Sequence, residues 1–328
     1  MKKRTKIICW ACDYVENHGE GILARNFVKL LKKNYNSKVI ILSPSRTFKN
    51  KDINFSFLYK YSSPLLGIII LWFHYLQGKK VCYLNFLPLW NTFLFIFLPP
   101  GTILGPITGF VYKEKISSIE TFLRKKIIPI LFKFNYQILK IRIKKIIFST
   151  NNLKEIFENH KTHLYNFFLY NFKKKKKVKK NIDFLIYHRQ YSTKENAFII
   201  NLIKNLIIKN YKIEIVGHKI NNKKVKNNGV ISRIKIREKL KRTRFTILSG
   251  ENLLSYFSID ALSENVKIFY NKKNYFDKNF LINKNFFFLN YDNLQSSLKK
   301  INKIYKSKSI ANTNKIFKNI PNFISYFD

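Results

Sequence analysis

The sequence predicts an α/β protein made of two doubly wound domains, each built on a parallel sheet. At 328 residues the chain exceeds one domain of ordinary size, and 46% of its residues are hydrophobic, enough to form two cores. Short β-like runs alternate with helical patterns in steps of about 30 residues, as parallel βαβ units do. The alternation stops at the polybasic stretch 173–180 and then starts again.

Short apolar runs rich in β-branched residues predict strands, and longer runs with apolar residues three and four apart predict helices. In the first half these criteria give strands at 6–11, 38–42, 80–84, 102–105 and 145–150, and helices at 21–33, 64–77 and 114–143. In the second half they give strands at 183–188, 212–217, 229–232, 245–249, 266–270 and 286–289, and helices at 194–209, 233–242, 253–264 and 291–305. We interpret the lysine-rich run 173–180 as a solvated linker, with a nuclear-localisation-like patch as the alternative, and place the domains at 1–171 and 172–328.

The charge balance is strongly basic. Lys and Arg number 62 against 18 acids, a net charge of +44, which points to a polyanion or an anionic membrane surface as partner. However, 52 of the cations are Lys and only 10 are Arg, whereas phosphate-reading proteins favour the bidentate fork of Arg. Lys rises together with Asn, Ile, Phe and Tyr, while Ala falls to 5, which is typical of an AT-rich coding bias. Much of the charge is therefore compositional, although the surface should still adhere to anionic lipid.

Three cysteines cannot form a disulfide framework, and the odd count favours a reducing cytoplasm. The Cys9-Trp10-Ala11-Cys12 spacing fits a redox or zinc half-site, but it has no second pair of ligands, and Cys9 falls inside a predicted buried strand. We therefore favour a packing role. The basic start and apolar run imitate a signal peptide, yet Asp13, Glu16 and Glu20 interrupt the run, so we expect no export.

Residues 61–112 carry only Lys79 and Lys80 as charges and could be mistaken for membrane spans. The run 64–76 is too short to span, and the run 81–98 has Asn and Pro in its interior, so we expect core elements with a peripheral contact on the inner face of the membrane. Integral insertion is the alternative. Residues 122–145 interleave Lys and Arg with large apolar residues, which indicates either a basic amphipathic surface helix or a core helix with a lysine-rich solvent face.

The motifs of several enzyme classes are absent: the sequence has no Asp-x-Asp metal clamp, no P-loop, no GxGxxG of Rossmann dehydrogenases, no HExxH of zinc proteases and no GxSxG of α/β-hydrolases. Polar residues instead follow successive strands of the second half, where ligands of doubly wound sheets bind. Arg189 and Lys194 share one loop, and a helix amino terminus near Asn252 to Ser255 also attracts anions, so together they predict a diphosphate pocket. Glu251 and Asp260 could accept hydrogen bonds from sugar hydroxyls. The alternative is that Glu251 caps the helix while Asp260 and Lys194 are surface charges.

These residues carry a resemblance. The second half resembles the carboxy-terminal domain of retaining GT-B glycosyltransferases of the "glycosyl transferases group 1" type. His188-Arg189-Gln190-Tyr191-Ser192-Thr193-Lys194 matches the Arg-x4-Lys loop of that family, and Val216-Gly217 matches a strand that ends in Gly. Ser249-Gly250-Glu251-Asn252 through Asp260 is similar to its Ser-x-x-Glu segment with a second acid. Here eight residues rather than seven separate the two acids, and the second acid is Asp.

The resemblance implies two Rossmann-like domains facing across a cleft, with the tail 306–328 crossing back to the first. It implies a nucleotide-sugar donor, a lipid-linked or glycan acceptor, retention, and neither cofactor nor metal, as in surface polysaccharide or lipopolysaccharide assembly. The implied roles are catalysis by His18 and Glu251; diphosphate binding by Arg189, Lys194, Asn252, Leu254 and Ser255; nucleoside binding by Gly217, Gly229, Ser232 and Asp260; and acceptor-side glycine loops at Gly19, Glu20, Gly21, Gly105, Thr108 and Gly109.

The alternative function is a nonenzymatic binder of polyanions such as RNA, which would use the lysine-rich faces and interleaved aromatic residues. We expect no specific nucleic-acid partner for the enzyme.

Overall fold

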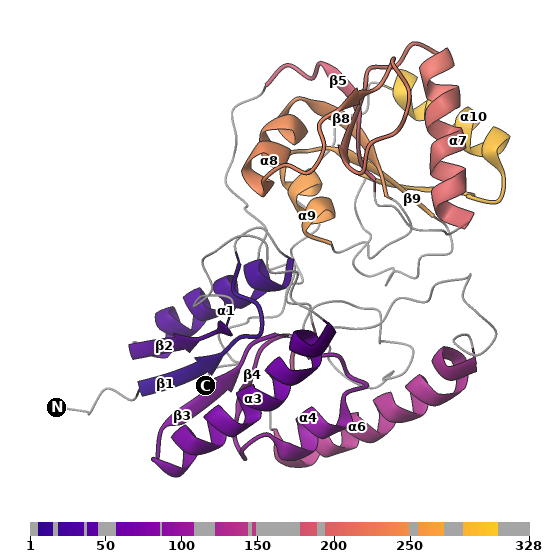
Figure 1. The fold of residues 1–328 in the computed structure, drawn as a ribbon. Coiled ribbons are helices and arrows are strands. Elements are labelled where there is room, and N and C mark those ends of the chain that lie inside the picture. Colours follow the sequence, from indigo (N-terminus) through magenta and orange to yellow (C-terminus); the bar gives the residue numbers. More distant parts are fainter. Residues whose placement is uncertain are drawn as a thin grey trace. The chain divides into compact units, whose positions relative to one another are not determined.

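Figure 1 shows the fold in a computed structural model of the chain, which forms two compact units. The structure describes residues 6–15, 19–35, 38–44, 57–85, 87–107, 122–143, 146–148, 178–188, 194–248, 255–271 and 285–307. The described residues up to 148 belong to the N-terminal unit and those from 178 to the C-terminal unit. The predicted boundary at 171 and 172, and the tail predicted to cross back, lie outside the described residues except for 306 and 307.

The N-terminal unit is built on a parallel sheet with the strand order β2-β1-β3-β4. Its strands are β1 (Lys6–Trp10), β2 (Lys38–Leu42), β3 (Lys80–Tyr83) and β4 (Ile103–Leu104). Cys9 of β1 pairs in register with Ile41 on one side and Cys82 on the other. A parallel bridge between Ile107 and Phe148 continues the sheet beyond β4, in the segment where the strand 145–150 was predicted.

Helices of the N-terminal unit are α1 (Gly19–Tyr35), α3 (Phe57–Leu76), α4 (Thr92–Phe97), the π-helical turn η1 (Leu123–Ile127) and α6 (Ile128–Arg142). The helix predicted to start at Pro64 begins seven residues earlier, with the proline inside it. The predicted helix 114–143 ends as expected, because Ile143 turns to extended backbone, and its first eight residues lie outside the described part of the chain. The apolar faces of α3, α4 and α6 join one core with β1 and β3.

The C-terminal unit contains a six-stranded parallel sheet in the order β10-β9-β8-β5-β6-β7. Its strands are β5 (Ile182–His188), β6 (Ile213–Gly217), β7 (Lys226–Asn227), β8 (Thr243–Ile247), β9 (Lys267–Asn271) and β10 (Phe286–Leu289). One face carries a row of phenyl rings across neighbouring strands, in which Phe245 stacks between Phe184 and Phe269 at centroid distances of 5.5 and 5.6 Å. Because both faces of β5, β8 and β9 are covered, these strands are almost continuously buried.

The helices described for this unit are α7 (Lys194–Ile208), α8 (Arg233–Lys241), α9 (Tyr256–Ser263) and α10 (Leu294–Lys306). The strand predicted at 229–232 is wrong. The strand β7 lies at Lys226–Asn227 instead, because Gly229 takes a left-handed backbone with φ of 66° and Ser232 already caps α8. Within the described residues no helix is both long and apolar enough to cross a bilayer.

Gly105 provides a test of the close approach between β3 and β4. A Cβ atom on Gly105 would overlap the carbonyl oxygen of Leu84, whereas Gly101 has a left-handed φ of 70° with open space around it. We expect Gly105→Ala to lower the free energy of unfolding by roughly 2–3 kcal/mol through overpacking, and Gly101→Ala by only about 1 kcal/mol of backbone strain. Tryptophan fluorescence during urea unfolding measures both, because Trp10, Trp72 and Trp90 all belong to the N-terminal unit. Equal effects of the two substitutions would contradict this interpretation of Gly105.

Candidate functional site

The strand order of the C-terminal sheet reverses between β5 and β8: β6 and β7 follow β5 on one side, and β8, β9 and β10 extend on the other. Such a switch point is where open parallel sheets bind ligands, just beyond the carboxyl ends of the strands. Arg189 directly follows β5, Lys194 is the first residue of α7, and Ser255 caps α9, which follows β8. The predicted diphosphate-binding segments therefore follow the two strands that flank this switch point. Arg189, Glu251, Asn252 and Leu254 themselves lie outside the described residues.

The edge between β5 and β6 is closed by backbone contacts around Gly217. This glycine ends β6 opposite His188, with a left-handed φ of 95°, and a Cβ atom there would overlap the His188 carbonyl. The His218 amide donates to the His188 carbonyl at 2.9 Å, and the buried His188 ring returns a 2.9 Å bond from Nδ1 to the His218 carbonyl. The Nδ1 atom must therefore carry a proton, since a carbonyl only accepts.

Gly217 and Gly229, both predicted at the nucleoside side, are brought together. The Gly217 amide donates to the Gly229 carbonyl at 2.9 Å. Ser232 follows shortly after and accepts a 3.5 Å bond from the Lys235 amide as the cap of α8. These residues share one loop region, and their role in nucleoside binding stays a prediction.

Ser255 begins α9. Its hydroxyl accepts a bond from the Ser258 amide at 3.2 Å and lies 2.9 Å from the Ser258 hydroxyl. Phe257 on the first turn stacks on Tyr187 of β5 at a centroid distance of 5.6 Å. This stacking holds the first turn of α9 against the carboxyl end of β5, and the diphosphate-binding role of Ser255 stays a prediction.

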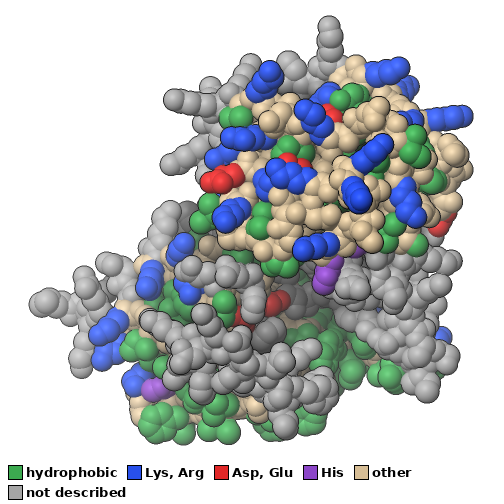
Figure 2. Space-filling model, turned by 45° about the horizontal axis from the view of Figure 1, so that its top comes forward, with side chains coloured by type: hydrophobic (Ala, Val, Ile, Leu, Met, Phe, Trp, Pro, Cys, Tyr) green, Lys and Arg blue, Asp and Glu red, His purple; other side chains and the backbone are tan. Residues whose placement is uncertain are grey.

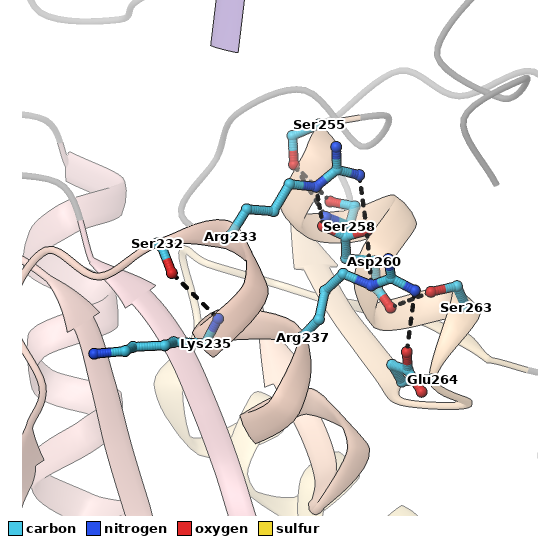
Figure 3. Close-up of polar contacts among 9 residues, drawn as sticks. All are labelled: Ser232, Arg233, Lys235, Arg237, Ser255, Ser258, Asp260, Ser263 and Glu264. Atoms are coloured by element: carbon cyan, nitrogen blue, oxygen red, sulfur yellow. Dashed lines mark hydrogen bonds and ion pairs between the residues drawn. The ribbon is translucent and has the colours of Figure 1, made fainter. Parts of the chain in front are cut away.

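Asp260 is held by two arginines of α8 that the sequence reasoning did not select (Figure 3). Arg233 makes a bidentate pair with it, at 2.6 Å from Nε and 2.8 Å from a terminal nitrogen, and Arg237 approaches at 3.7 Å. Arg237 also pairs with Glu264 at 3.5 Å. Burial would lower the pKa of Arg233, but the hydrogen bonds and charge of Asp260 outweigh it and raise that pKa.

The Arg233–Asp260 ion pair affects the predicted contact between Asp260 and the ribose of the donor. The Asp260 side chain is 5% exposed, and both of its oxygens accept bonds from Arg233, so a ribose hydroxyl would compete with a guanidinium for the same carboxylate. No sequence signal pairs these two side chains, because they stand 27 positions apart on different helices. The only local signal is Ser232, which caps α8 directly before Arg233 and so places this arginine on the first turn of the helix.

The N-terminal sheet has its own switch point, between β1 and β3. Asn85, which follows β3 and is fully buried, bridges it. Its amide nitrogen donates to the Asp13 carbonyl and, at 3.2 Å, to the Glu20 carbonyl, while the Asp13 amide donates to its oxygen at 3.3 Å. The predicted Gly19-Glu20-Gly21 segment opens α1 at this same edge. Asn85 was missed, although an Asn placed directly after a buried strand is the kind of signal used elsewhere in the chain.

The predicted glycine loops serve close backbone packing. A Cβ atom on Gly21 would overlap the Val15 carbonyl, and one on Gly105 would overlap that of Leu84. The space beside both glycines is thus filled by the chain's own backbone. His18, Thr108 and Gly109 lie outside the described residues, so their roles stay predictions.

The three cysteines are free and buried, and Cys9 lies inside β1 as predicted. Burial raises the pKa of the Cys82 thiol well above its usual value, and burial also raises the pKa of Cys12, whose sulfur lies 3.1 Å from the Tyr83 hydroxyl. Neutral thiols in a core act as packing groups. In the described part of the chain no cluster of His, Cys, Asp and Glu has the grouping of a metal site.

A basic hollow of about 980 Å³ lies at the opposite, amino-terminal edge of the C-terminal sheet. Its walls come from the starts of β5 and β6, from β7 and from α8, and its cations are Lys212, Lys224, Lys226, Lys235, Lys239, Lys241 and Arg242. On the face of the C-terminal unit that Figure 2 shows, Lys and Arg side chains are spread out rather than gathered at one point. Of the predicted site residues that the structure describes, none lines this hollow.

No protein-family model and no curated protein sequence matches the chain. Solved structures match along almost the whole chain. Sucrose-phosphate synthase from Thermosynechococcus elongatus has a TM-score of 0.58 at 9% identity and covers 94% of this chain and 92% of its own. A Listeria monocytogenes protein assigned as a UDP-N-acetylglucosamine 2-epimerase has a TM-score of 0.54 at 12% identity, covering 93% and 89%. Anabaena HepE, solved with UDP and glucose, has a TM-score of 0.50 at 11% identity, covering 93% and 90%.

The chain has the GT-B fold. The predicted fold class is thereby confirmed, while the "group 1" type and retention stay predictions. Each Rossmann-like unit contributes one switch point, and the roles of the site residues predicted near these points stay predictions.

The Arg233–Asp260 pair should be a main stabilising contact between α8 and α9. In Asp260→Asn the half-buried Arg233 loses its counter-charge, so we expect the free energy of unfolding to fall by about 2–3 kcal/mol. Glu238→Gln on the exposed face of α8 serves as the control and should change it by less than about 0.5 kcal/mol. Thermal unfolding followed by circular dichroism measures both, and a neutral Asp260→Asn would show that the pair contributes nothing net.

Glu214 gives a pH test at the basic hollow. Burial alone would raise its pKa, but the 2.6 Å bond from Lys239, the bond from Asn228 and the charge of Lys226 outweigh burial and lower the pKa. A lowered pKa adds stability above the ordinary Glu range near about 4.3, and this stability is lost as the pH falls through the folded-state pKa. The stability gap between wild type and Glu214→Gln should therefore be largest near neutral pH and close in acid, as urea midpoints measured at several pH values would show. A constant gap would contradict this.

Proposed function

We propose that this protein is a nucleotide-sugar-dependent glycosyltransferase. The observation that carries the proposal is that the two segments selected for the diphosphate follow β5 and β8, the strands that flank the switch point. The sugar is transferred with retention to a lipid-linked or oligosaccharide acceptor, in the assembly of a surface polysaccharide or lipopolysaccharide.

The donor half of the site belongs to the C-terminal unit. Arg189, Lys194 and the amino terminus of α9 at Ser255 hold the donor diphosphate. When the nucleoside diphosphate leaves, negative charge develops on it, and these groups stabilise that charge more in the transition state than in the ground state. Protein cations and amides supply the counter-charge in this scheme, and Glu251 orients the transferred sugar.

The acceptor half belongs to the N-terminal unit, at the switch point between β1 and β3. His18 stands at the start of the Gly19-Glu20-Gly21 segment and contacts the reacting centre. Asn85 fixes this loop through the Asp13 and Glu20 carbonyls, so its role is to position the segment.

Similar structures support the donor class by analogy only. Sucrose-phosphate synthase is named for a sugar phosphate that it makes, and HepE was solved with UDP and glucose. The Listeria protein is named as an epimerase, so the same fold also serves a reaction in which no acceptor takes part. Product analysis must therefore separate transfer from epimerisation.

Donor binding provides the first test. UDP-, GDP- and ADP-sugars are added to the full chain and the melting temperature is recorded, since a ligand that binds the folded state stabilises it by mass action. One donor class should raise the melting temperature by several degrees, and Arg189→Ala with Lys194→Ala should abolish the rise. The control is Lys204→Ala with Lys209→Ala, which removes two exposed lysines from the same helix and the turn after it and should leave the rise intact.

Two outcomes would contradict the proposal. If no sugar nucleotide stabilises the wild type, the donor site is absent. If a donor binds but NMR shows its conversion to an epimer, with no transfer to lipid-linked or oligosaccharide acceptors, the protein is an epimerase.

The basic hollow favours a second candidate, a nonenzymatic polyanion binder. If this is correct, Lys224→Gln, Lys235→Gln and Lys241→Gln together should abolish salt-sensitive RNA binding in filter assays, and donors should have no effect on melting. Under the glycosyltransferase proposal, this triple variant keeps donor binding, and its RNA adsorption falls only in proportion to the charge removed.

A further inference from the structure

The N-terminal unit exposes a large apolar surface over three helices and the π-helical turn η1. Large hydrophobic side chains with at least a third of their area in solvent occupy α3, α4, η1 and α6: Leu65, Leu66, Ile69, Phe73, Leu76, Phe93, Ile96, Phe97, Leu123, Ile127, Ile130, Phe134 and Ile141. Soluble monomers rarely expose a contiguous apolar patch larger than a few hundred Å² unless it binds something. We call this surface the α3–α4–α6 face.

Direct bonds between the helices make the face continuous. The Trp72 indole of α3 donates a 2.7 Å hydrogen bond to the Phe97 carbonyl of α4, and Arg142 of α6 donates to the carbonyl of Leu98, the residue that caps α4. Figure 1 shows the three helices side by side in the N-terminal unit. Their opposite faces enter the same core, so each helix directs its exposed stripe away from that core.

The helix α6 has three distinct faces. Phe132, Tyr136 and Leu139 are buried, whereas Ile130, Phe134 and Ile141 are exposed at helical spacing, with Ile130 66% and Ile141 87% in solvent. In η1 and α6, the residues Lys126, Lys133 and Lys140 recur every seven positions and are all exposed. At 3.6 residues per turn this spacing places Lys133 and Lys140 of α6 in one stripe next to the apolar one, and Lys126 lies in η1, the turn that leads into α6.

The charge of the face is one-sided. The helices α3, α4, η1 and α6 contain no Asp or Glu. A second copy docked on this face would bring lysine stripes together with no carboxylate from these helices to pair them. An anionic phospholipid surface offers both an apolar interior for the side chains and phosphates for the lysines.

We propose that the α3–α4–α6 face inserts into the interface of a bilayer that contains anionic phospholipid. The apolar stripes enter the boundary between headgroups and acyl chains, and Lys126, Lys133 and Lys140 contact the phosphates beside them. The helices lie in the membrane plane. This inference concerns attachment of the full chain and does not depend on the proposed transfer reaction.

Vesicle flotation tests the proposal on the full chain, with phosphatidylcholine vesicles prepared with and without phosphatidylglycerol. The wild type should float with the anionic vesicles, and less so at high salt. A variant with one exposed side chain changed on each of the three helices, Ile69→Ser, Phe93→Ser and Ile130→Ser, should lose at least about tenfold in partitioning.

Matched controls separate this face from general surface apolarity and general charge. The apolar control changes equally exposed residues of the C-terminal unit, Ile208→Ser, Val230→Ser and Ile234→Ser, and should float like the wild type. Lys126→Gln, Lys133→Gln and Lys140→Gln should remove the preference for phosphatidylglycerol, whereas Lys204→Gln, Lys209→Gln and Lys299→Gln should weaken it much less.

Trp90 reports insertion independently of flotation. It precedes α4 and is 40% exposed, while Trp10 is buried. Trp72 of α3 is half-buried at the same face. Brominated lipids should quench the fluorescence of the wild type, and Trp90→Phe should lose the part of that quenching that Trp90 contributes, while the part from Trp72 remains.

Three results would overturn the proposal. The wild type could stay in solution with anionic vesicles, or the apolar control could lose binding as much as the α3–α4–α6 variant. Alternatively, sedimentation could show a dimer that this variant converts to a monomer, with no binding to vesicles, in which case a second copy covers the face.

Discussion

Parallel strand pairing in two separate sheets is the constraint on which the rest of the structure depends. Every strand pair among the described residues is parallel, so all strands of a sheet end at one edge. In the C-terminal unit the stacked rings of Phe184 and Phe245 hold β5 against β8, the two strands between which the order reverses. The segments after these strands therefore start from adjacent positions. The location of any chemistry at that edge follows from packing within the sheet.

The elements themselves could be predicted because their signals are local. A run such as residues 183–188 is apolar, short and bounded by polar residues, and it forms β5 within one residue of the prediction. The strand predicted at 229–232 is absent, because the prediction gave the apolar residues Val230 and Ile231 more weight than Gly229. The left-handed backbone of Gly229 ends the extended segment, and a glycine before a capping serine is a stronger sign of a turn than of a strand.

Contacts between distant residues could not be predicted. The Arg233–Asp260 pair joins two helices, and Asn85 contacts Asp13, which lies 72 positions earlier. In neither case does the spacing of the two residues in the sequence indicate that they are in contact. Sequence reasoning placed Asp260 correctly on α9 but did not find the arginines that occupy its carboxylate. A polar residue at a strand end indicates where a site lies, while its partners depend on how the covering helices pack.

Compositional bias and function can be told apart by comparing the two units. A coding bias toward Lys, Ile and Phe acts on the whole chain, and in the C-terminal unit those residues behave as expected, with phenyl rings stacked inside and lysines spread outside. Bias alone would expose apolar side chains equally in both units, whose described parts are of similar length. Yet fifteen of the twenty exposed large hydrophobic residues that the structure describes lie in the N-terminal unit, thirteen of them on four adjoining helical segments without a single acid. Drift in composition does not choose one face of one unit, whereas the contact with an anionic bilayer that we propose accounts for that choice.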